Sequence, residues 1–72
     1  MANPVLIEKR KALEVIRIKK RQVWERMERN KLLQRQFRDI CDVSILEHML
    51  ECHIFAYRLF REIETDIRGL DK

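Results

Sequence analysis

The feature that most constrains this chain is the spacing of its apolar residues between Leu46 and Leu70. Only an α-helix gathers side chains three and four positions apart onto one stripe, because a strand alternates its faces at every second residue. A helix that is apolar on one side is stable in water when that side packs against another helix. The stretch therefore predicts an amphipathic helix and a second helix beside it. The stripe consists of Leu46, Met49, His53, Ala56, Phe60, Ile63, Ile67 and Leu70.

The first half of the chain is expected to supply that second helix. Asn3 can accept hydrogen bonds from free amides at a helix start, and Pro4 suits the first helical position. From Val5 to Phe37 the chain has neither Gly nor Pro, and strong helix formers dominate. Its stripe comprises Val5, Leu6, Ala12, Leu13, Ile16, Val23, Trp24, Met27, Phe37 and Cys41, with Lys9, Lys20, Asn30 and Gln34 on the same side. Asn30 is the one position where the helix is expected to bend or break.

A turn is expected between the two helices, over residues 39–44. Ser44 and Glu47 have the spacing of a capping box, and Asp42 is an alternative cap. Gly69 is expected to end the second helix in the left-handed conformation, with Leu70 folded back over the last turn. The sequence thus predicts a single all-α domain over residues 1–72. It is an antiparallel helical hairpin with a long helix over about 4–38 and a second helix over about 45–68.

Apolar residues outside the two stripes predict that the hairpin associates with another protein chain. A second helix of about 36 Å cannot cover a first helix of about 50 Å, so the first turns would stay bare. A chain of 72 residues also has only a small core of its own. We therefore expect a homodimer that forms a four-helix bundle, and a monomer bound to a different protein is the alternative. The apolar residues outside the stripes are Ile7, Val15, Ile18, Leu32, Leu50, Ile54 and Tyr57.

This layout resembles that of a known family. A short two-helix chain that dimerises into an antiparallel bundle, with His53 and Ala56 interrupting the apolar seam, is similar to the Rop family of plasmid copy-number RNA-binding proteins. The resemblance is one of layout. It implies the bundle architecture and assigns no functional residue.

Charge is divided unequally along the chain. Residues 1–41 hold 12 Lys and Arg against five acids, whereas residues 42–72 hold four against seven. Bases with one aromatic among them recur on one side of the first helix, and we call this set the basic rail: Arg10, Arg17, Arg21, Trp24, Lys31, Arg35 and Arg38. Such a rail can neutralise the phosphates of RNA or DNA, or it can be a solvated helix face. The chain has no motif of a double-helix groove reader, and both interpretations remain open.

Few residues suggest chemistry. His48 and Cys52, four positions apart, could bind zinc, but a full ligand set is missing, and both cysteines are expected to be buried on the apolar face. His53 is expected to pack in the core, bonded to Lys20, a glutamate or a carbonyl. A catalytic triad, paired catalytic carboxylates and a Gly-rich phosphate loop are all absent from the sequence. The sequence therefore predicts no enzymatic activity, no cofactor, no metal and no small-molecule substrate.

The sequence as a whole favours a small helical interaction protein, such as a regulator, an adaptor or a chaperone-like hairpin. A cytoplasmic location is expected, because two irregularly placed cysteines do not suggest a disulfide framework and no signal peptide or membrane span is recognisable. Nucleic-acid binding through the basic rail is the alternative function. The residues expected to dock on a protein partner are Ile7, Val15, Ile18, Ile54 and Tyr57.

Overall fold

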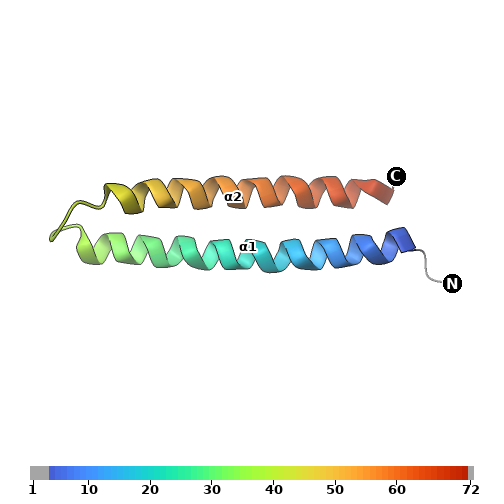
Figure 1. Ribbon diagram of the computed structural model, residues 1–72, viewed down its shortest axis with the longest axis horizontal. Coiled ribbons are helices and arrows are strands. Elements are labelled where there is room, and N and C mark those ends of the chain that lie inside the picture. The colour runs from blue at the N-terminus through green and yellow to red at the C-terminus, as the bar shows by residue number, and fades with distance from the viewer. Residues whose placement is uncertain (1–3, 72) are drawn as a thin grey trace.

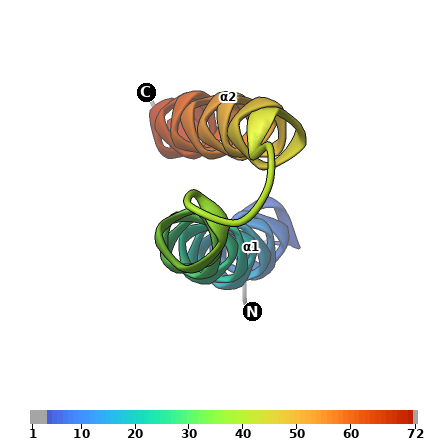
Figure 2. The same cartoon turned by 90° about the vertical axis from the view of Figure 1, so that its left-hand side faces the viewer.

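The computed structural model contains two long helices, α1 (Pro4–Phe37) and α2 (Ser44–Arg68), and a short 3-10 helix, η1 (Gly69–Asp71). It describes the backbone of residues 4–71 and the side chains of residues 8–70. The helices lie side by side and antiparallel, with the connection at one end and the start of α1 and the end of α2 at the other (Figure 1). The view along the hairpin shows the two helices as a single layer (Figure 2). The all-α helical hairpin expected from the sequence is therefore confirmed.

The hairpin is elongated. Its principal extents are 61 × 17 × 11 Å, and its radius of gyration is 17.0 Å. A compact chain of this length would have a radius of gyration of about 11 Å. Two helices in one layer cover each other on one side only, so much of each helix surface remains open to solvent.

α1 runs through Asn30 without interruption, so the break that the sequence allowed there does not occur. Asn bends or ends helices when its side chain bonds to its own local backbone. In this chain the Asn30 side chain bonds elsewhere: its Nδ2 donates to the Leu46 carbonyl of α2 at 3.0 Å, and its Oδ1 accepts from Gln34 Nε2 at 2.6 Å. The helix backbone at Asn30 keeps its own hydrogen bonds as a result.

The start of α2 differs from the predicted capping box. Ser44 is the first helical residue, and its backbone amide donates to Asp42 Oδ1 at 2.9 Å, as does its hydroxyl group. These two hydrogen bonds lower the pKa of Asp42, the side-chain bond being the larger cause. The amide of Glu47 bonds to the carbonyl of Val43 at 2.9 Å. The capping-box prediction is wrong because the Ser44 hydroxyl is already bonded to Asp42.

The end of α2 also differs from the prediction. Gly69 has φ −74° and ψ −10°, a right-handed conformation, and the chain continues into η1. Its amide lies within hydrogen-bonding reach of the carbonyls of Thr65, Asp66 and Ile67, which tightens the last turn without reversing it. Leu70 is consequently 66% exposed and does not fold back over the helix.

The core of the hairpin is thin. Ile16, Val23 and Met27 of α1 and Val43 of the connection are buried, whereas no residue of α2 is fully buried. Several half-buried residues of α2 face α1. Four of them recur at every seventh position, and we call these four the inner row: Leu46, His53, Phe60 and Ile67. Five other residues that the sequence placed on the packed stripes are exposed, because they flank the contact line and a single layer leaves the flanks open: Trp24, Phe37, Cys41, Met49 and Leu70.

An ion pair between Lys20 of α1 and Glu64 of α2 joins the two helices. Lys20 Nζ lies 3.0 Å from Glu64 Oε1, and the two side chains are only 21% and 15% exposed. The hydrogen bond from Lys20 is the main cause that lowers the pKa of Glu64, and the charges of Arg68, Lys20 and Arg61 act in the same direction. Closer to the start of α1, Lys9 Nζ donates to the Arg68 carbonyl at 3.2 Å.

We expect the stability of the hairpin to fall in acid through Glu64. The pKa of this carboxyl is lower in the folded chain than its ordinary 4.5, so its ionisation stabilises the fold above that pH. The contribution disappears as the pH drops through the lowered pKa. Thermal melts from about pH 6 to pH 3 should show a steeper loss of Tm in the wild type than in Glu64→Gln. Glu51→Gln, at an exposed position of α2, is the control, and a pH dependence unchanged by Glu64→Gln would contradict the assignment.

Candidate interaction surfaces

α2 has an exposed apolar row in addition to the inner row. Its members alternate at spacings of four and three, and we call them the outer row: Ile45, Met49, Cys52, Ala56, Leu59, Ile63, Asp66 and Leu70. Ile45 is 77% exposed and Leu59 is 45% exposed, while Ala56 and Ile63 are half-buried because they also border the contact with α1. Asp66 is the one charged member, and Phe55, 69% exposed, lies beside the row. α2 thus presents two adjacent heptad seams, of which α1 covers one.

The outer row was not predicted because it shares residues with the apolar stripe expected from the sequence. Met49, Ala56, Ile63 and Leu70 belong to both, so their spacing was assigned to the stripe that faces α1. A second set of residues that recurs at every seventh position of α2 could have revealed the outer row. Residues 45, 52, 59 and 66 each come immediately before a member of the inner row.

The five residues expected to dock on a partner occupy different positions. Val15 and Ile18 are exposed on α1, at 54% and 47%. Ile54 and Tyr57 are half-buried, and the ring centroid of Tyr57 lies 5.7 Å from that of Trp24. The side chain of Ile7 lies outside the described residues, as do those of Val5 and Leu6. The structure therefore brings Tyr57 to the basic rail, where Trp24 lies, and leaves Val15 and Ile18 on open surface of α1.

All seven residues of the basic rail are exposed. Arg10 and Arg17 line a groove between the helices together with Leu13, Glu14, Glu64 and Arg68. Acids moderate the charge of this groove: Arg17 Nη2 lies 2.8 Å from Glu14 Oε1, and Arg68 Nη1 lies 3.9 Å from Glu64 Oε1.

Further along α1, Lys31 Nζ lies 3.6 Å from Glu28 Oε1 and 6.0 Å from the centre of the Trp24 ring. The long arm of Lys31 therefore lies over an aromatic face, where a cation is attracted by the ring electrons. Arg21, Arg35 and Arg38 complete the exposed rail.

A second groove between the helices borders the outer row. It is lined by Arg26, Arg29, Asn30 and Leu33 of α1 and by Leu46, Met49 and His53 of α2. Met49 of the outer row therefore faces two arginines across this groove. His53 is half-buried there, and Lys20, one of the three partners that the sequence suggested for His53, is bonded to Glu64.

The cysteines are exposed, which corrects the expectation that they are buried. Both cysteines lie off the line where the two helices meet. Neither thiol is therefore covered by the opposite helix. Cys52 Sγ lies 4.0 Å from His48 Nε2, one helical turn away. Among the described residues, no three His, Cys, Asp or Glu side chains come close enough together to hold a metal ion.

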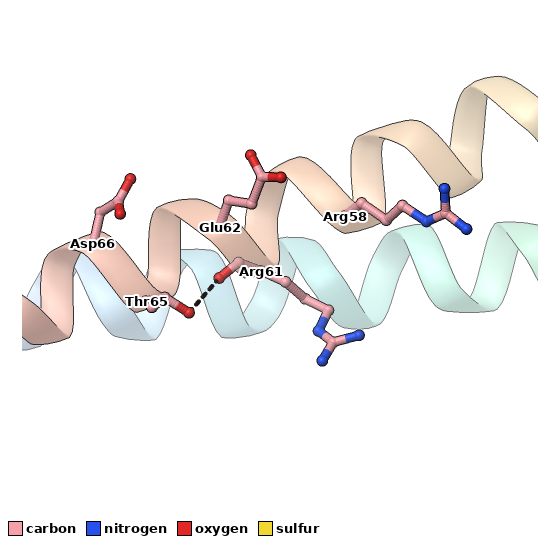
Figure 3. Close-up of a pocket in the computed structure, with 5 residues that line it drawn as sticks. All are labelled: Arg58, Arg61, Glu62, Thr65 and Asp66. Atoms are coloured by element: carbon pink, nitrogen blue, oxygen red, sulfur yellow. Dashed lines mark hydrogen bonds between the residues drawn. The ribbon is translucent and has the colours of Figure 1, made fainter.

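An open depression lies on the second half of α2, with Arg58, Arg61, Glu62, Thr65 and Asp66 around it (Figure 3). Glu62 and Asp66 project from one side of the ribbon and Arg61 from the other, and Thr65 Oγ1 donates to the Arg61 carbonyl at 3.0 Å (Figure 3). The depression belongs to one helix, and its charges are mixed. Ligand sites usually enclose most of the ligand and exclude water, which a depression on one helix does not do.

Comparisons of this chain with protein-family models, with curated proteins and with solved structures found no match. Within the described residues, neither helix has an apolar stretch long enough to cross a membrane.

Proposed function

We propose that the chain is a non-enzymatic helical interaction protein that acts by docking on another protein through the outer row of α2. The observation that supports this most is the row itself, whose large apolar members Ile45, Met49, Leu59 and Leu70 are exposed at helical spacing. Exposed apolar residues scattered singly are ordinary, whereas a continuous row on one helix matches the way amphipathic helices dock in grooves or bundles. A role as regulator, adaptor or chaperone-like hairpin fits such a surface. The exposed free thiols of Cys41 and Cys52 favour a reducing cytoplasm as the location.

The exposed area supports the same proposal. The hairpin exposes 6,214 Å², whereas a compact protein of 8.9 kDa exposes about 4,800 Å². Small domains with so little buried apolar surface are usually stabilised by a partner or a staple. The docking surface proposed here is the outer row, in place of the set that includes Ile54 and Tyr57, because α1 already covers those two in part.

The proposal is tested by comparing Leu59→Asp with Leu32→Asp. Leu59 belongs to the outer row, and Leu32 is an exposed leucine of α1 with a similar exposed fraction, 51% against 45%. We expect both variants to keep the helicity of the wild type in circular dichroism. When the immobilised chains are incubated with a cell lysate, the wild type and Leu32→Asp should retain the same proteins. The amount of these proteins retained by Leu59→Asp should be at least ten-fold lower. Equal retention by all three chains would overturn the proposal.

Nucleic-acid binding remains a second candidate, favoured by one observation. Arg10, Arg17 and Arg68 come from two helices and line one groove, so the basic rail of α1 is extended by α2. The same retention experiment tests this candidate with bulk RNA at low and moderate salt. Retention of RNA that salt weakens, and that the charge reversals Arg17→Glu and Arg35→Glu abolish, would favour it over protein docking. RNA retention unchanged by these reversals would exclude the rail.

A further inference from the structure

We infer that the occupant of the outer row is a second copy of this chain, with the two α2 helices packed antiparallel along their outer rows. The inference rests on the proposed function, because it names the protein that docks on the row. It also goes beyond a general expectation of dimerisation, since it assigns the helix, the row and the register of the contact.

The outer row is complementary to itself when one copy is reversed. Antiparallel pairing about a point between Tyr57 and Arg58 brings every member of the row opposite another member. The central pairs set the small Ala56 against the large Leu59, a combination that lets a knob enter a hole. The pairs are Ile45 with Leu70, Met49 with Asp66, Cys52 with Ile63, and Ala56 with Leu59.

The contact runs along the whole of α2. Ile45 and Leu70 are 25 positions apart, about 37 Å of helix, so a second α2 in this register leaves neither end of the row bare. Phe55, beside the row, would lie over the flank of the second helix and lose much of its 69% exposure.

The area available agrees with a stable dimer. A compact dimer of twice this mass exposes about 8,000 Å², whereas two separate hairpins expose twice 6,214 Å². The difference, about 4,400 Å², lies within the range of about 2,000 to 5,000 Å² that obligate homodimers bury. The excess surface of the hairpin is therefore of the size that one second copy can cover.

Charge favours α2 over α1 as the docking surface for that second copy. Arg26 and Arg29 line the α1 side of the groove next to Met49, so an apolar row laid on that part of α1 would cover two cations. When the outer row of one copy packs on the outer row of the other, it contacts apolar side chains at most positions. Asp66, the charged member, would lie near the end of the contact, opposite Met49 and one position from His48 of the second copy.

The register is tested with a cysteine introduced opposite Cys52. In Cys41→Ser/Ile63→Cys, position 52 of one copy lies against position 63 of the other. Within one chain these positions are 11 residues apart, about 16 Å along one helix, which is too far for a disulfide. Like positions of the two copies would be a similar distance apart. We expect mild oxidation to convert most of this variant to a covalent dimer on a non-reducing gel, and Cys41→Ser/Cys52→Ser/Ile63→Cys to form none.

A second variant covers the case in which Ile63→Cys disturbs the fold. Cys41→Ser/Cys52→Ser/Ile45→Cys/Leu70→Cys changes two exposed positions of the row and tests the same register at its ends. Sedimentation of the reduced wild type should give twice 8.9 kDa. A dimer mass without covalent dimer in either cysteine variant would overturn the antiparallel register.

A mass of one chain at all concentrations would overturn the inference that the partner is a second copy. The docking function would still be decided separately by the retention of other proteins on the wild type and on Leu59→Asp. Failure of the inference and failure of the proposed function therefore give different results.

Discussion

Replacing Asn30 by Ala is expected to lower the free energy of unfolding by about 2 kcal/mol. Asn30 is 4% exposed and Gln34 is 7% exposed, and the Asn30 side chain joins Gln34 to the Leu46 carbonyl of α2. The substitution removes the acceptor of the Gln34 amide and leaves that donor buried without a partner. An unpaired buried polar group costs about 1–3 kcal/mol. Urea unfolding followed by circular dichroism, at fixed protein concentration, measures the loss.

The double variant Asn30→Leu/Gln34→Leu separates the loss of the hydrogen bonds from the cost of leaving one partner unpaired. Because both polar groups are removed together, its free energy of unfolding should lie within about 1 kcal/mol of the wild type or above it. Gln36→Ala, at an exposed position of α1, is the control. A double variant that is less stable than Asn30→Ala would contradict this account of the pair.

The same polar pair is expected to set the register of the hairpin. Its hydrogen bond to Leu46 ties one position of α1 to one position of α2, whereas apolar contacts alone tolerate small shifts along the helices. The double variant should therefore show broader amide signals in NMR spectra than the wild type, even where it is equally stable.

Met27→Ala is expected to lower the free energy of unfolding by about 2–3 kcal/mol, the lower part of the range for buried large-to-small changes. Met27 is 7% exposed at the centre of the α1 contact, so its removal leaves a void that only neighbouring half-buried side chains can fill. A single core in a domain of this size supplies only a few kcal/mol, so the variant should be substantially unfolded at 25 °C.

Leu32→Ala is the matched control for Met27→Ala. Leu32 is 51% exposed on α1, and Ala is at least as good a helix former, so the free energy of unfolding should change by less than about 0.5 kcal/mol. Both variants are compared by urea unfolding at the same protein concentration, because association would make the midpoint depend on concentration. Equal effects at the two positions would mean that Met27 is not part of the core.

The helices and their antiparallel arrangement were predictable from the sequence. The helical spacing on either side of residues 39–44, and a first helix free of internal Gly and Pro, predicted all four ends of α1 and α2 to within one residue. These features are local: the period of the helix decides which side chains share a face. The buried Ile16, Val23 and Met27 follow from that period alone.

The capping of α2 was predicted less well than its bounds, because competing local hydrogen bonds decided it. Ser44 was available for a capping box, but Asp42 accepts both of its donors. Gly69 can adopt the left-handed conformation that ends many helices. Its amide instead bonds within the last turn, and its backbone stays right-handed. The sequence named the right residues and could not rank their alternative bonds.

The sequence by itself determined that this chain forms two amphipathic helices in a hairpin, because helical periodicity depends only on the order of residue types. Only the tertiary structure decided which of two overlapping rows of α2 faces α1, and therefore that Ile45, Cys52 and Leu59 are exposed. It also decided that Asn30 and Gln34 are buried as a bonded pair. The physical reason is that the outer row overlaps the apolar stripe read from the sequence, so helical periodicity fits either face of α2 against α1. The rotation of each helix about its own axis is set by the packing of both helices together.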